Sequence, residues 1–78
     1  MSYHALKNFK TALERSPRNG YVAELHTQAI KYAGELEGMT NREITDALGI
    51  GSSFGTEMAK MRKIAPRLIA AGLEVDRL

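Results

Sequence analysis

The chain has 78 residues, fewer than the roughly 100 to 150 of a typical domain, which leaves no room for a second domain or an enclosed substrate cleft. Its composition, 44% hydrophobic and 26% charged, is that of a folded globule, and the absence of cysteine excludes disulfides and thiolate metal sites. Eleven basic and nine acidic residues give a net charge of +2, too small by itself to indicate a nucleic-acid binder.

The spacing of the apolar residues is helical rather than alternating, so we expect a single all-α domain over residues 1–78, built from four to five helices. No apolar run approaches the ~18 residues that cross a bilayer, and the first residues lack the pattern of a secretory signal. We therefore expect a cytoplasmic protein that makes no membrane contact.

The first half of the chain predicts two helices. One lies between Ser2 and Ser16, with an apolar stripe on one side, and it ends at the turn-forming run of residues 16–20. The second is expected over residues 21–37, with Gly38 as its left-handed stop. Its expected buried face consists of Val22, Leu25, Ala29, Ala33 and Leu36.

The clearest local signal begins at Thr40. Threonine and Glu43 stand at the spacing of a capping box, which predicts the start of a short helix there. Gly49 can adopt the positive φ that ends such a helix, and Ile50 would then fill the turn. The expected buried side of this helix is Ile44, Ala47 and Leu48.

A further helix is expected to start at a cap supplied by Ser52 or Ser53 and to end near Ala65, because Pro66 disfavours helical backbone at the residue before it. A short helix would follow Pro66 and stop at Gly72. The apolar side of the longer helix would comprise Phe54, Met58, Met61 and Ile64. Two helices joined by a glycine-containing turn predict a helix-turn-helix at about residues 40–64.

The run GMTNREI at residues 38–44, followed by ALGI at residues 47–50, closely resembles the helix-turn-helix of LuxR-type regulators and of region 4 of sigma factors. The resemblance covers about residues 27–64. It implies that residues 40–48 cross the phosphate backbone and that residues 53–64 lie in the major groove of DNA. Thr45 and Gly55 depart from the usual pattern, so we expect one or two extra residues in the turn, with Phe54 or Met58 in the core position.

The expected DNA contacts combine short polar side chains with cations. A basic stretch over residues 60–67 carries four cations and no acid, which suits the neutralisation of phosphates, although cations near a helix C-terminus also have a purely structural use. Glu57 would oppose DNA binding if it faced the groove. The candidate DNA-binding residues are Asn41, Arg42, Ser52, Ser53, Thr56, Lys60, Lys63 and Arg67.

The first-helix stripe of Tyr3, Leu6, Phe9 and Leu13 has two interpretations. It is either part of the core or the interface of a homodimer, which would double the DNA contacts of so small a domain. We expect no catalysis, cofactor or metal, because no nucleophile-base pair, phosphate-binding loop or ligand cluster appears, and His4 and His26 are expected on the surface.

Taken together, the sequence predicts a small regulator of transcription, of bacterial or phage type, that binds double-stranded DNA. The alternative is a protein-interaction module, such as a phage-type inhibitor or adaptor, that uses the same helical scaffold against a host protein. Fold alone does not separate these two functions, because function depends on the site.

Overall fold

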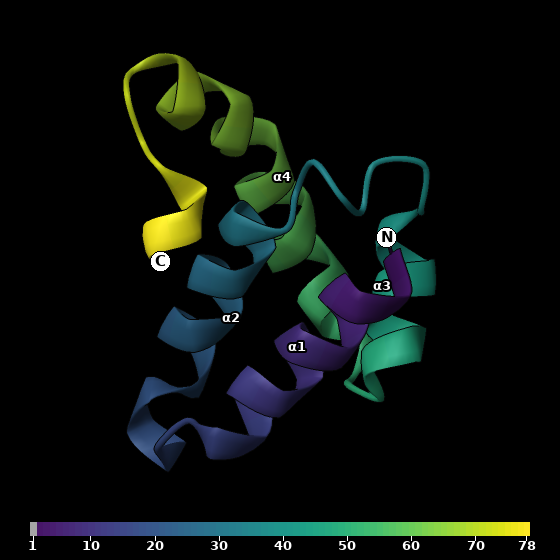
Figure 1. The fold of residues 1–78 in the computed structure, drawn as a ribbon. Helices are drawn as coiled ribbons and strands as arrows, with labels where there is room; N and C mark the ends of the chain where they lie inside the picture. Colours follow the sequence, from purple (N-terminus) through teal and green to yellow (C-terminus); the bar gives the residue numbers. More distant parts are fainter. Residues whose placement is uncertain (1) are drawn as a thin grey trace.

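Helices account for most of residues 2–78, the part of the chain that the computed structural model describes (Figure 1). The α-helices are α1 (Ser2–Arg15), α2 (Tyr21–Lys31), α3 (Asn41–Leu48) and α4 (Gly55–Ala70). Short 3-10 helices are η1 (Arg18–Gly20), η2 (Ser52–Phe54) and η3 (Val75–Arg77). Residues 2–78 contain no strand, which confirms the expected all-α class. None of the helices in this part of the chain is long and apolar enough to cross a membrane.

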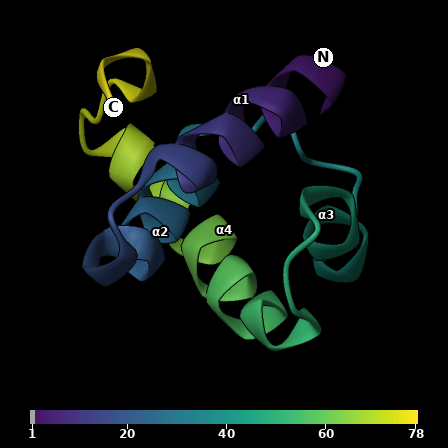
Figure 2. The ribbon, with the colours of Figure 1, turned by 90° about the horizontal axis from the view of Figure 1, so that it is seen from below.

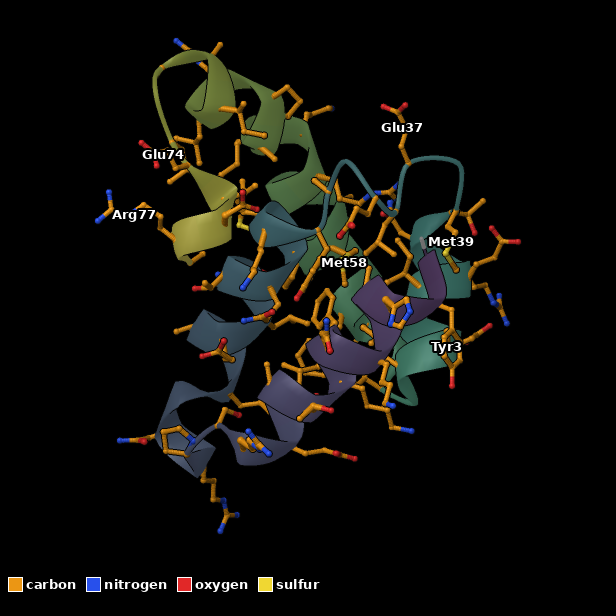
Figure 3. All side chains as sticks on the ribbon, viewed as in Figure 1. Tyr3, Glu37, Met39, Met58, Glu74 and Arg77 are labelled. Carbon is orange, nitrogen blue, oxygen red and sulfur yellow. The ribbon has the colours of Figure 1, made fainter. Side chains whose placement is uncertain are left out.

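The helices surround one core. Both α1 and α4 contact α2 and α3, so α2 and α3 lie on opposite sides of the molecule (Figure 2). Met58 of α4 points into the space between the helices (Figure 3). The largest fully buried apolar side chains are Phe9, Leu25, Leu36, Ile44 and Met58. Burial of each such side chain is worth about 1.5 to 3 kcal/mol relative to exposure.

The α1 stripe contributes to this core. Phe9 and Leu13 are buried and Leu6 is half-buried against them, whereas Tyr3 is 73% exposed. A homodimer interface through Phe9 and Leu13 is therefore wrong, because these side chains already pack inside their own chain. Ala5 is buried as well, since it lies one helical turn from Phe9.

Helix α2 ends six residues earlier than expected. After Lys31 the backbone continues as a series of turns through Gly38, which has φ +101° as predicted. Gly34 lies within these turns, and glycine weakens a helix by up to about 1 kcal/mol relative to alanine. Residues 32–38, here called the 32–38 segment, still bury Leu36. Val22, in the first turn of α2, is exposed, contrary to expectation.

Helix α3 has the predicted ends. Thr40 Oγ1 accepts from the Glu43 amide at 3.1 Å, Glu43 Oε1 accepts from the Thr40 amide at 2.7 Å, and Gly49 follows with φ +72°. The buried face differs from the prediction, however. It consists of Ile44, Thr45 and Leu48, whereas Ala47 is exposed. The Thr45 hydroxyl donates to the Arg42 carbonyl at 3.0 Å, and this bond offsets the cost of burying it.

Helix α4 differs from expectation at both ends. It starts at Gly55, after η2, with Phe54 at the capping position and no side-chain cap, so neither Ser52 nor Ser53 caps it. It also runs through Pro66 to Ala70. Pro66 has no N–H to donate within the helix. The helix nevertheless continues past it, and at its C-terminal end the amides of Ala71 and Leu73 donate to the Leu68 carbonyl. Of the expected apolar side, Met58 is buried and Ile64 is exposed.

Candidate nucleic-acid interface

Helices α3 and α4 form the two arms of the predicted helix-turn-helix. Residues 49–54 connect them, and η2 makes this connection longer than a minimal turn. Phe54 is half-buried against the core, with its ring centroid 5.8 Å from that of Tyr21, while Ile50 is half-buried in the same way. The turn is therefore extended, and Phe54 and Met58 both occupy core positions.

One face of α4 carries a row of polar and basic side chains. At about 100° per residue, Thr56, Lys60, Lys63 and Arg67 fall within an arc of roughly 60° on the side opposite Met58 and Ala65. All four residues are exposed, whereas Met58 and Ala65 are buried. Because α4 continues through Pro66, Arg67 stays in this row, which we call the basic face.

The cations of the basic face differ in whether they form an ion pair with a neighbouring carboxylate. Lys60 Nζ lies 3.8 Å from Glu57 Oε2 on the same helix. Within residues 2–78, Lys63 and Arg67 form no ion pair. These two side chains are therefore free for an anionic partner, and the exposed pair of Lys60 is readily exchanged for such a partner.

Arg62, the fourth cation of the basic stretch, has a structural role. Its Nη1 donates to Asn41 Oδ1 at 2.7 Å, and its Nη2 donates to the Leu36 carbonyl at 3.2 Å. It thereby links α4 to the start of α3 and to the 32–38 segment. Asn41 is thus brought next to α4, with its carbonyl oxygen engaged by Arg62 rather than directed at solvent.

Arg42, Ser52 and Ser53 complete the predicted set and are exposed. Arg42 Nε lies 3.9 Å from Asp46 Oδ2, one turn further along α3, in a pair open to solvent. Such exposed ion pairs contribute little to the stability of the fold, and Arg42 can readily exchange Asp46 for another anionic partner. The two serines lie in η2, directly before the first turn of α4.

Glu57 does not lie within the basic face. Its Oε1 accepts a hydrogen bond from His26 Nε2 of α2 at 2.8 Å, and both side chains are about one-third exposed. This hydrogen bond, followed by the charge of Lys60, holds the pKa of Glu57 below the usual range of a glutamate. The carboxylate is therefore ionised and turned towards α2, where its repulsion of phosphates is reduced.

Two of these residues escaped the sequence reasoning. The sequence predicts His26 on the surface and Arg62 as one of the four cations of the basic stretch, and it indicates neither contact. Glu57 lies 31 residues from His26 in the chain. Leu36 and Asn41 lie 26 and 21 residues from Arg62. No spacing rule connects positions so far apart, so only the packing of the helices could show these contacts. Within residues 2–78, no group of three or more histidine or acidic side chains is placed to hold a metal ion.

Comparison with known protein families finds a match. A family model described as an HTH-like domain matches residues 1–71, which include all four α-helices and not only the α3 and α4 pair. No curated protein and no solved structure matches the chain. The match covers nearly the whole chain, so this protein belongs to the family of HTH-like domains.

Proposed function

We propose that this protein binds double-stranded DNA as a small regulator of transcription, with α4 lying in the major groove. The observation that carries the proposal is the exposed basic face of α4, with Lys63 and Arg67 unpaired among the described residues, on the second arm of a helix-turn-helix. Helix-turn-helix proteins place this second helix in the major groove, with its first residues at the base edges. The likeness of residues 38–50 to LuxR-type and sigma-factor motifs supports the same function.

The chemistry of the face suits two kinds of DNA contact. Lysine and arginine side chains neutralise phosphates and release the counterions that surround them, which gives affinity without sequence preference. At the start of α4, Thr56 and the preceding Ser52 and Ser53 are short hydroxyl residues that allow the backbone to approach the groove closely.

The first experiment measures affinity for a mixed-sequence duplex as a function of salt. The test variant is Lys60→Ala with Arg67→Ala, and the matched control is Lys7→Ala with Lys10→Ala, which removes two exposed cations from α1 instead. We expect the wild-type affinity to fall steeply as salt rises, and the test variant to flatten that dependence by about one unit of slope per side chain. The control should bind like the wild type.

The same assay separates this function from the alternative. Equal losses in the test and control variants would mean that net charge, and not the basic face, determines binding. Absence of binding even at low salt would reject DNA as the partner and would leave the protein-interaction module, directed at a host protein, as the function to pursue.

A further inference from the structure

A groove of about 700 Å³ lies beside the basic face, between the 32–38 segment and residues 59–70 of α4. Its lining is mostly apolar and consists of small side chains at most positions. The apolar residues that line it are Ala33, Gly34, Ala59, Ala65, Pro66, Ile69 and Ala70. Of the proposed DNA contacts, Asn41 and Lys63 also line this groove, whereas Lys60 and Arg67 do not.

Ile69 stands out among the described residues that line the groove, because it alone has a large, branched apolar side chain. It is 46% exposed, on the α4 wall. The opposite wall contains Ala33 and Gly34, and nothing lies within 4 Å of a Cβ built on Gly34. One wall thus offers a projecting side chain, and the other offers the space to receive one.

The charges on the two walls are also opposite. Glu37 stands on the 32–38 segment and projects outward from the molecule (Figure 3). Lys63 stands on the α4 wall. Both residues are exposed, and neither forms an ion pair within residues 2–78.

We propose that the groove binds a second copy of this chain, in a symmetric dimer whose two-fold axis runs along the groove. Such an axis places the α4 wall of each copy over the 32–38 wall of the other. Lys63 of one copy then faces Glu37 of the second copy, and Ile69 faces the space around Gly34. A self-complementary surface of this kind, with matching shape and charge, is what a two-fold interface requires.

Lys63 belongs both to this groove and to the basic face, so the test of the dimer contains no DNA. Sedimentation equilibrium across the micromolar range should give a mass that rises towards twice the 8.6 kDa of one chain. Ile69→Glu should keep the protein at the mass of a single chain. The matched control is Val22→Glu, because Val22 is also a helical residue that is 46% exposed but does not line the groove. Circular dichroism of each variant reports whether the fold is retained.

Charge reversal then tests the orientation of the two copies. Glu37→Lys places like charges opposite each other at both ends of the interface, as does Lys63→Glu, and either change should weaken dimerisation at least tenfold. The two changes together restore opposite charges and should restore the dimer. This rescue is not expected for any interface in which these residues do not face each other.

Three results would overturn the proposal. The first is a wild-type chain that keeps the mass of one copy throughout the micromolar range. The second is a dimer that persists in Ile69→Glu. The third is a double charge-reversal variant that dimerises no more tightly than either single variant. In the first case the groove would be left to a different partner. Because Lys60 and Arg67 do not line the groove, failure of the dimer and failure of the DNA proposal would be seen in separate experiments.

Discussion

Long-range contacts of single polar side chains hold the helices of this protein in register. Arg62 donates to the Asn41 side chain and to the Leu36 carbonyl, and so satisfies an acceptor in a segment that has no regular helix. Hydrogen bonds from a charged donor are shorter and stronger than neutral ones. In the same way, His26 links α2 to the first turn of α4 through its hydrogen bond to Glu57.

The His26 and Glu57 contact predicts a dependence of stability on pH. Because folding lowers the pKa of Glu57, the folded state holds fewer protons near that pKa than the unfolded state. The contribution of ionised Glu57 to the stability of the fold is therefore complete above its unfolded-state pKa of about 4.3, and it is lost as the pH falls through its folded-state pKa. We expect Glu57→Gln to lower the melting temperature at pH 7 and to have little effect in acid.

Thermal unfolding followed by circular dichroism at several pH values measures this difference. The matched control is Glu14→Gln, which removes an exposed carboxylate from α1. A difference between the wild type and Glu57→Gln that is the same at pH 7 and in acid would show that the charge of Glu57 does not contribute through His26.

Among the secondary-structure elements, the two arms of the helix-turn-helix begin in different ways. Helix α3 has a complete capping box, so two of its terminal amides are bonded by side chains within four residues of sequence. Helix α4 begins from η2 without a side-chain cap, and its start is fixed instead by Phe54, which packs against Tyr21 and the core. One start is thus determined locally and the other by tertiary contact.

This difference predicts unequal effects of two similar substitutions. Thr40→Ala removes the hydroxyl that accepts from the Glu43 amide and should lower the free energy of unfolding by about 1 kcal/mol. Ser53→Ala should leave it nearly unchanged, because this exposed side chain caps no helix. Urea denaturation measures both values, and equal losses would contradict the assigned start of α4.

The molecule as a whole is organised around a single core to which every α-helix contributes. Leu36 is fully buried in this core although it belongs to the 32–38 segment rather than to a regular helix. At the other end of the chain, η3 contacts α2, and Lys31 Nζ donates to the Leu78 carbonyl at 3.1 Å. From these contacts we expect residues 2–78 to unfold as one cooperative unit.

Cooperativity of this kind is tested by Leu36→Ala. Truncation of a fully buried leucine should cost about 2 to 5 kcal/mol, and in a single core that loss should lower the denaturation midpoint of the helical signal and of tyrosine fluorescence together. Val22→Ala, at an exposed position of α2, should cost much less. Midpoints that separate between the two signals would show that the 32–38 segment unfolds on its own.

The sequence by itself determined the all-α class, both ends of α3, the core role of Met58 and the side of α4 on which the cations lie. Each depends on signals that act within about one helical turn, such as helical periodicity, a capping box or a glycine with positive φ.

The tertiary structure alone decided where α2 stops, that α4 continues through Pro66, that Phe9 and Leu13 face inward, and that His26 and Arg62 bind partners far along the chain. It also decided which cations remain free on the basic face. These outcomes follow from how the helices cross, because the surroundings of a side chain depend on elements that its own neighbours in sequence do not specify.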